Sequence, residues 1–221
     1  MSDLKNWTPR PFPERKVLAG RYCRLEPLDV GKHGADIWAA FKGADSVWAY
    51  LPAAQPQSQA EYEALLASMV NNQDICPFAV IVDGKAVGHM WMMEIRPAHG
   101  VFEVGWITYS PSLQRTAAAT EAVYLIGDYG FSLGYRRYEW KCNNRNEPSK
   151  RAALRFGFTF EGLFRQHQVV KGENRDTAWY SIIDAEWPAR KAAFERWLAH
   201  ENFDAQGRQK VSLSSLNGKA A

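Results

Sequence analysis

The stretch that decides the fold is S-P-S-L-Q-R-T-A-A-A-T-E-A, which occupies residues 110–122. A strand-like pattern ends at Tyr109, Pro111 interrupts strand pairing, and small residues then open a helical pattern. The first N–H groups of a helix have no internal acceptors and lie at the positive end of the helix dipole. Small side chains there would let a phosphate approach those groups closely, and Arg115 adds a positive charge. Taken alone, the pattern is more typical of a good helix former than of an anion site.

The segments on either side predict one α+β domain with a single mixed sheet. Apolar alternation predicts strands, and apolar residues at helical spacing predict helices. The strands are expected at residues 17–28, 77–82, 86–95, 101–109, 137–143, 158–168 and 175–184, and the helices at 33–44, 58–70, 115–131, 146–156 and 188–200. Within 137–143 the even-numbered residues, which include Trp140 and Cys142, share one face, and the odd-numbered residues, which include Lys141, share the other.

Composition narrows the class of protein. With 46% hydrophobic residues the 221-residue chain can bury a sizeable core, and a net charge of +3 does not by itself indicate a nucleic-acid partner. The three cysteines and five histidines have neither disulfide nor metal-ligand spacing, so we expect no disulfide framework and no metal site. No apolar run is long enough to span a membrane, and the first residues do not resemble a signal peptide, so we expect a cytoplasmic protein without a membrane partner.

The chain is expected to divide into four parts. Prolines punctuate residues 1–16, which predicts an extended N-terminal arm. Residues 17–187 are expected to form the domain and residues 188–203 a C-terminal helix. Residues 204–221 are polar and small, which predicts a flexible tail.

A series of short motifs begins within the strand expected at residues 101–109. F-E-V-G-W-I stands at 102–107, Q-R-T-A-A-A-T-E-A at 114–122, N-E-P-S at 146–149, R-F-G-F at 155–158, F-E-G-L-F-R at 160–165 and R-D-T-A-W-Y-S-I at 175–182. In this order and spacing they resemble the GNAT superfamily of N-acetyltransferases, and in particular its RimJ/RimL-type (acetyltransferase 3) branch. The resemblance covers roughly residues 15–187, and it implies a mixed central sheet that is splayed at a bulge and flanked by helices.

The loop departs from the family pattern at two positions. Ala117 stands where the family usually has glycine, and Arg115 stands where a second glycine is common. Alanine keeps the N–H donor but disfavours a positive φ. We therefore expect a site held by helix N–H groups and Arg115 that is looser than the usual one.

The resemblance implies acetyl-CoA as the cosubstrate and no metal. In the family the pantetheine lies in the splay like an added strand, which implicates the backbone of Ile107, Thr108 and Tyr109, with one N–H polarising the thioester carbonyl. The implied cofactor-binding set continues through the loop and the next helix, with Gln114, Arg115, Thr116, Ala117, Ala118, Ala119, Thr120, Asn146, Ser149 and Arg151. From the residues alone, Asn146 is equally a helix N-cap and Arg151 part of a solvated basic face.

Glu103 is the first candidate for the catalytic base, and Glu94 is the alternative. A carboxylate on a central strand beside an apolar cleft could have a raised pKa and accept a proton from an ammonium group. Alternation alone does not determine its face, so a solvated or structural role stays open. The resemblance makes Ser149 a candidate acid at the leaving thiolate, with water as the alternative. Trp48, Tyr50 and Glu94 are the candidates for the acceptor pocket.

These features predict an acetyl-CoA-dependent N-acetyltransferase in which a primary amine attacks the thioester directly within a ternary complex. The acceptor is a protein N-terminal α-amine or a small-molecule amine, and nothing in the sequence separates the two. The protein is expected to be a monomer or homodimer that binds no nucleic acid. The alternative is a non-catalytic acyl-CoA-binding or interaction module on the same fold, which the alanine at position 117 favours.

Overall fold

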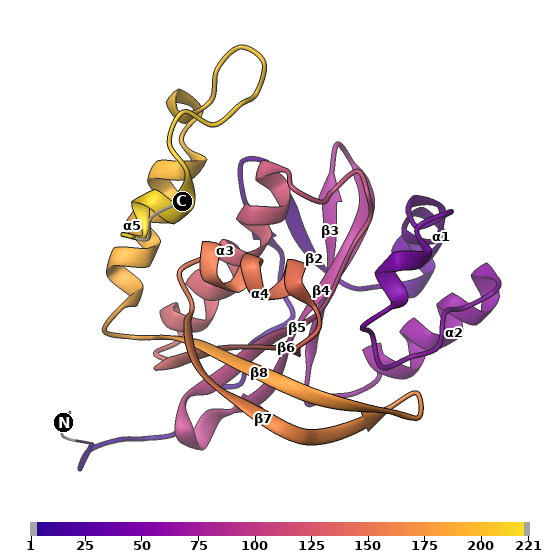
Figure 1. The fold of residues 1–221 in the computed structure, drawn as a ribbon, viewed down its shortest axis with the longest axis horizontal. Coiled ribbons are helices and arrows are strands. Elements are labelled where there is room, and N and C mark those ends of the chain that lie inside the picture. Colours follow the sequence, from indigo (N-terminus) through magenta and orange to yellow (C-terminus); the bar gives the residue numbers. More distant parts are fainter. Residues whose placement is uncertain (1–3, 219–221) are drawn as a thin grey trace.

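The computed structural model describes residues 4–218, which form an eight-stranded sheet with helices on both faces (Figure 1). The strands lie in the order β1-β2-β3-β4-β5-β6-β8-β7. Neighbouring strands are antiparallel except for β5 and β6, which run parallel. The predicted α+β class with a single mixed sheet is therefore confirmed.

Most elements lie where the sequence patterns predict them. The strands are β1 Leu18–Ala19, β2 Arg24–Pro27, β3 Cys76–Val82, β4 Lys85–Arg96, β5 Val101–Tyr109, β6 Arg137–Asn143, β7 Thr159–Val170 and β8 Glu173–Ile183. The helices are α1 Val30–Ala40, α2 Gln59–Val70, α3 Ala117–Ser132, α4 Glu147–Arg155, α5 Trp187–Leu198 and α6 Leu213–Leu216. Short 3₁₀ turns lie at Asp45–Trp48, Pro97–His99 and His200–Asn202.

The first predicted strand is interrupted between β1 and β2. There the backbone N–H groups of Arg21, Tyr22 and Cys23 donate to the carboxylate of Glu121, at 2.7, 2.6 and 2.8 Å. Glu121 lies on α3 and is 4% exposed, so this acceptor is buried. The turn depends on a partner far along the chain, which local alternation does not reveal.

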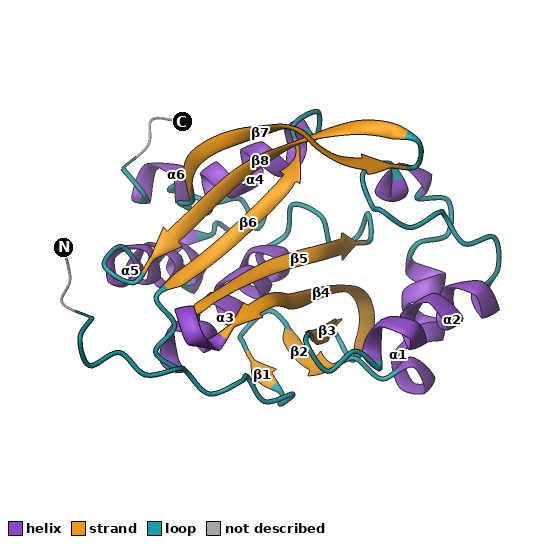
Figure 2. Cartoon of the chain, turned by 90° about the horizontal axis from the view of Figure 1, so that it is seen from below, coloured by secondary structure: helices purple, strands orange, loops and turns teal. Residues whose placement is uncertain are grey.

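Two clusters of apolar side chains hold the helices to the sheet. One face of the sheet, with Phe102 and Tyr138 stacked at 4.6 Å, packs against α3 and α5. On the other face, α1 and α2 pack over β3 and β4 around Tyr62. Trp140 and Cys142 belong to the first cluster, which confirms that the even-numbered residues of β6 share a buried face. The α1/α2 layer leaves the odd-numbered face of β6 uncovered by helix (Figure 2).

Turns and caps follow their sequence signals. Asp83 and Gly84 both have positive φ, at 49° and 80°, as a two-residue hairpin turn requires. Ser58 caps α2 by accepting from the N–H of Glu61 at 3.2 Å, and the Glu61 carboxylate accepts from the N–H of Gln57 at 2.8 Å. The predicted start of the helix at Ser58 is confirmed.

The described part of the N-terminal arm, residues 4–16, contains no helix or strand and lies along the domain. The guanidinium group of Arg15 donates to the carbonyl oxygens of Val70, Asn72 and Ile75, at 3.0, 2.6 and 3.0 Å. Residues 1–3 lie outside the described residues. Residues 4–16 are extended and are anchored by hydrogen bonds.

The C-terminal segment differs from the flexible tail that the sequence predicts. Leu213 on α6 is fully buried, and the indole N–H of Trp197 donates to the side chain of Gln209 at 2.7 Å. The side-chain amide of Asn217 donates to the carbonyl oxygen of Arg155 at 3.0 Å. Residues 204–218 therefore pack against α4 and α5, and residues 219–221 lie outside the described residues.

Candidate functional site

The site begins where β5 and β6 separate. Their parallel pairing runs from Val101↔Arg137 to Glu103↔Glu139 and then stops. Beyond that point β5 continues to Tyr109 beside β4, and β6 continues to Asn143 beside β8. The two strands diverge into a V, which Figure 2 shows near the centre of the sheet. The splay that the family resemblance implies is therefore present.

A bulge in β5 accompanies this divergence. Between the pairs Trp91↔Gly105 and His89↔Thr108, β5 contains one residue more than β4. Trp106 lies at the bulge with φ +48°, a left-handed conformation that bulky residues rarely adopt. Its indole ring stacks on Trp91, with centroids 4.9 Å apart. A bulge bends a strand and increases its twist, so this residue turns the end of β5 away from β6.

Glu103 lies at the base of the V, at the last position of β5 that pairs with β6. It is 6% exposed, and its carboxylate lies 2.7 Å from the ammonium group of Lys141. Burial raises the pKa of Glu103 to about 7, although the charge of Lys141 opposes the rise. A carboxyl group with this pKa exchanges a proton near neutral pH.

Charged side chains surround this pair on the uncovered face. Lys141 also lies 3.9 Å from Glu139, which forms ion pairs with Arg96 and Arg137. The ammonium group of Lys141 is 4.2 Å from the ring centroid of Trp179 on β8, a cation–π contact. The negative charge of Glu139 is thus balanced by two arginine side chains. The ammonium group of Lys141 lies closer to Glu103 than to Glu139.

The loop after β5 leads into an open helix start. The Thr116 side chain caps α3 by accepting from the N–H of Ala119 at 3.1 Å, and the side chain of Gln114 donates to the carbonyl oxygen of Tyr109 at 2.9 Å. Arg115 is exposed and has φ +62°. The N–H groups of Ala117 and Ala118 belong to the first helical turn, which has no internal acceptors. An anion near Arg115 would meet these donors.

Alanine at position 117, where the family usually has glycine, causes no backbone strain in this loop. Ala117 is the first residue of α3 and has no positive φ, whereas Arg115 does. The left-handed position is therefore the one where the sequence has arginine. Thr120 is 2% exposed, and its hydroxyl accepts a hydrogen bond from Arg155 at 3.0 Å, so its side chain joins α3 to α4 rather than lining an open surface.

The second helix start belongs to α4, just after β6. Asn146 caps it by accepting from the N–H of Ser149 at 3.1 Å, as the sequence predicts for an N-cap. The Ser149 hydroxyl accepts a hydrogen bond from the indole N–H of Trp140 at 3.0 Å, and it is also within hydrogen-bond reach of the Cys142 thiol. Cys142 is a buried free thiol, and burial raises its pKa, which suits a structural role. Arg151 is exposed, as a solvated basic face predicts.

The three acceptor-side candidates have different environments. Trp48 is 5% exposed and packs edge-on against Tyr62, so its ring belongs to the core cluster under α2 rather than to an open pocket. Tyr50 is 39% exposed, and its hydroxyl donates to the carbonyl oxygen of Arg145 in the loop between β6 and α4. Glu94 is exposed, has φ +47°, and is close enough to raise the pKa of Glu103.

Sequence reasoning did not single out Lys141, Trp179 or Arg175 as site residues. Alternation did place Lys141 on the face opposite Trp140, and that signal could have identified it. The position of Trp179 opposite Lys141 follows from the β6–β8 register, which pairs these two residues. A register between strands so distant in sequence is not visible in a single chain.

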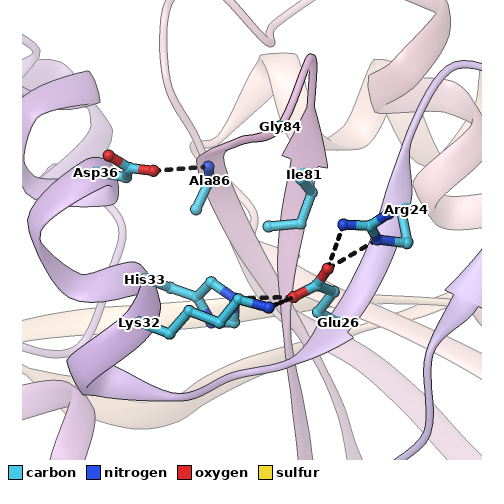
Figure 3. Close-up of a pocket in the computed structure, with 8 residues that line it drawn as sticks. All are labelled: Arg24, Glu26, Lys32, His33, Asp36, Ile81, Gly84 and Ala86. Atoms are coloured by element: carbon cyan, nitrogen blue, oxygen red, sulfur yellow. Dashed lines mark hydrogen bonds and ion pairs between the residues drawn. The ribbon is translucent and has the colours of Figure 1, made fainter.

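A separate pocket lies between β2, α1 and the β3–β4 hairpin (Figure 3). The Glu26 carboxylate, 6% exposed, forms ion pairs with Arg24 and Lys32 there and lies 3.1 Å from Nε2 of His33. These contacts, led by the hydrogen bond from Lys32, lower the pKa of Glu26 to about 2. None of the predicted site residues lines this pocket. The cluster fastens α1 to the edge of the sheet.

Residues 4–218 contain no group of three or more histidine, cysteine or acidic side chains arranged to hold a metal ion. None of the helices in this part of the chain is long and apolar enough to cross a membrane.

Comparison with known proteins agrees with this geometry. Residues 24–159 match the family model described as an acetyltransferase (GNAT) domain. A GCN5-related N-acetyltransferase from Brucella melitensis has the same fold with a TM-score of 0.95 and 52% identity, over 97% of this chain and 100% of that one. A probable GNAT-family acetyltransferase from Chromobacterium violaceum superimposes with a TM-score of 0.82 and 39% identity, over 86% of this chain and 96% of that one.

Curated relatives match over shorter stretches. An uncharacterised N-acetyltransferase of Bacillus subtilis is 33% identical over 45% of this chain, and the match spans 56% of that relative's length. A ribosomal-protein-serine acetyltransferase of Escherichia coli is 30% identical over 49% of this chain and 62% of its own length. The class of protein is an acetyltransferase, as the family match and the splayed strand pair both indicate. This chain belongs to the acetyltransferase (GNAT) family, and the predicted resemblance is confirmed.

Proposed function

We propose that this protein transfers the acetyl group of acetyl-CoA to a primary amine by direct attack within a ternary complex. The observation that carries the proposal is the V between β5 and β6 with Glu103 at its base. An acyl thioester bound along the unpaired edge of β5 would present its carbonyl group beside a carboxylate that titrates near neutrality. A cytoplasmic location belongs to the same proposal.

The donor side of the site is supported by the two helix starts. The first-turn N–H groups of α3 and the Arg115 guanidinium would bind the pyrophosphate of CoA. The unpaired edge of β5 between Gly105 and Tyr109 would bind the pantetheine amides as an added strand. A Cβ at position 105 would lie 2.4 Å from the sulfur of Met93, so a larger residue there would displace the Met93 side chain.

In the proposed reaction Glu103 removes the proton that the amine must lose. The nitrogen lone pair attacks the thioester carbonyl carbon, the amide C–N bond forms, and the C–S bond breaks. The amine proton passes to Glu103, and the CoA thiolate takes up a proton from Ser149 or from water. The Ser149 hydroxyl is the protein candidate because it carries a proton and lies at the start of α4, held by the indole N–H of Trp140.

Relatives support an amine as the acceptor but name more than one. One relative is a ribosomal-protein-serine acetyltransferase, and another, 27% identical over 58% of this chain, is a spermidine N(1)-acetyltransferase. The N(1) group of spermidine is a primary amine.

Calorimetric titration with acetyl-CoA, combined with a thiol-release assay over a panel of amines, tests the proposal. We expect saturable binding of acetyl-CoA and release of CoA that depends on the amine. Tight binding without CoA release for any amine would favour the non-catalytic module instead. No binding of acetyl-CoA would contradict both. Because Ala117 adopts an ordinary helical conformation, the feature that favoured the module no longer supports it.

A further inference from the structure

Arg175 on β8 is a cation without a protein partner. Among residues 4–218, no carboxylate lies within ion-pair distance of its guanidinium group, and its Nε atom is buried without a hydrogen bond. Burial lowers the pKa of this side chain. The side chain is half-buried, and a buried polar atom without a hydrogen-bond partner is unfavourable and uncommon in folded proteins.

The position of Arg175 places it at the acceptor side of the V. Trp179, four residues later on β8, pairs with Lys141 across the β6–β8 ladder and contacts its ammonium group. Residues 175 and 179 have the same parity on a regular strand and therefore share a face. Arg175 is also close enough to Cys142 and to Glu103 for both groups to act on it electrostatically.

A second unpaired donor lies on the same face. The indole N–H of Trp179 is buried and has no hydrogen-bond partner among the described residues. Its ring is flanked by Phe164 on β7, with centroids 4.8 Å apart. A partly buried cation and an unpaired indole donor on one face favour a ligand group that accepts hydrogen bonds and carries negative charge.

We propose that the amine acceptor of this enzyme carries an anionic group, a carboxylate or phosphate, which Arg175 binds while Glu103 faces the amine. The proposal rests on the proposed acetyl transfer and adds the class of acceptor. An anion at Arg175 would pair a guanidinium group that has no other partner, and the indole N–H of Trp179 can supply a further hydrogen bond.

The charges facing Glu103 argue against a dicationic acceptor. Lys141 already lies 2.7 Å from Glu103, and Arg175 adds a second positive charge nearby. Of the acidic neighbours, Glu139 is paired with two arginines, which leaves the exposed Glu94 as the remaining negative charge. The second ammonium group of a diamine would meet these cations, and like-charge contacts reject a ligand effectively.

The test compares ω-amino acids with α,ω-diamines of equal chain length, from two to six carbons, in the thiol-release assay. For the best chain length we expect kcat/KM to favour the amino acid by about tenfold or more. Arg175→Gln should abolish that preference while leaving the KM for acetyl-CoA unchanged. Arg165→Gln, which removes an exposed arginine of β7, is the matched control and should retain the preference.

Three results would overturn the proposal. One is a preference for the diamine at every length. Another is a rise in the KM for acetyl-CoA in Arg175→Gln with unchanged acceptor selectivity, which would assign Arg175 to the anionic groups of CoA. If no amine releases CoA, the proposed acetyl transfer is contradicted. The acceptor class is then tested by calorimetric titration of the same amino acids and diamines into the CoA-bound protein. Equal or diamine-favoured binding there would overturn the anionic-acceptor proposal separately.

Discussion

At the scale of single residues, Glu103 and Arg115 carry most of the proposed chemistry. Glu103 is buried beside a lysine and titrates near neutrality, so small changes around it alter its protonation at physiological pH. Arg115 is exposed but held in a left-handed conformation at the start of α3. Burial of the Glu103 carboxylate and the left-handed backbone of Arg115 both lower the stability of the fold. Destabilising features of this kind are common at functional sites.

Glu103→Gln tests the base directly. A general base must be deprotonated, so the kcat/KM of the wild-type protein should rise with pH through about 7, the pKa of Glu103. The glutamine variant should lose this step and fall by about 10²–10⁴-fold above pH 8. The measurement is a pH–rate profile with one amine. A variant that keeps the step near pH 7 would exclude Glu103 as the base.

Arg115→Gly separates strain from charge. Glycine adopts a positive φ freely, so the variant should be more stable by up to about 1 kcal/mol in urea unfolding. Losing the guanidinium charge should weaken acetyl-CoA binding about tenfold, equivalent to about 1.4 kcal/mol. Arg115→Lys, which keeps a charge and the strained backbone, is the control and should change neither quantity much. Unchanged affinity in the glycine variant would remove Arg115 from the cofactor site.

At the scale of elements, α3 connects the site to the edge of the sheet. Its N-terminal turn faces the proposed pyrophosphate site, and Glu121 one turn later receives three N–H groups from the turn between β1 and β2. A Cβ at position 20 would lie 2.3 Å from the Glu121 carboxylate, so the turn approaches α3 as closely as glycine allows. This contact gives the glutamate of the T-E-A motif a structural role.

Glu121→Gln should therefore destabilise the protein without altering the chemistry of the site. An amide group offers one acceptor oxygen and directs its own N–H groups at the backbone donors. We expect a loss of about 2 kcal/mol in urea unfolding, the size of a hydrogen bond to a charged group. Glu173→Gln, at a side chain 78% exposed, is the control and should stay within about 0.5 kcal/mol. Equal effects of the two substitutions would contradict the role of Glu121.

The sequence predicts elements whose pattern is local and misses contacts that depend on register. Alternation located β5 and β6, and residue spacing located the caps at Ser58 and Asn146. The ion pair between Glu103 and Lys141 joins strands that a helix separates in sequence, so it follows only from the parallel β5–β6 pairing. The order of the C-terminal segment depends on burial of Leu213, a single leucine in a polar stretch.

At the scale of the whole molecule, two buried carboxylates should shape the pH dependence of stability in opposite directions. Glu26 has its pKa lowered to about 2, so its contribution is present above its unfolded pKa near 4.5 and lost as pH falls toward 2. Glu103 has its pKa raised to about 7, so folding is favoured below 4.5 and penalised as pH rises from 4.5 through 7.

Urea unfolding at several pH values checks this balance. Glu103→Gln, which mimics the protonated carboxyl group, should be more stable than the wild type by about 2 kcal/mol at pH 8 and no more stable at pH 4. Glu26→Gln should be less stable at pH 8 and approach the wild type near pH 2. Parallel pH curves for all three proteins would show that neither carboxylate contributes as described.

The central claim is that the V between β5 and β6 binds acetyl-CoA with Glu103 at the reacting end, and a crystal structure of the complex with CoA tests it most directly. We predict pantetheine along the edge of β5 between Gly105 and Tyr109, pyrophosphate at the first turn of α3 beside Arg115, and the thiol directed toward Glu103. CoA bound elsewhere, or a V closed by β5 pairing with β6 beyond Glu103, would contradict the account.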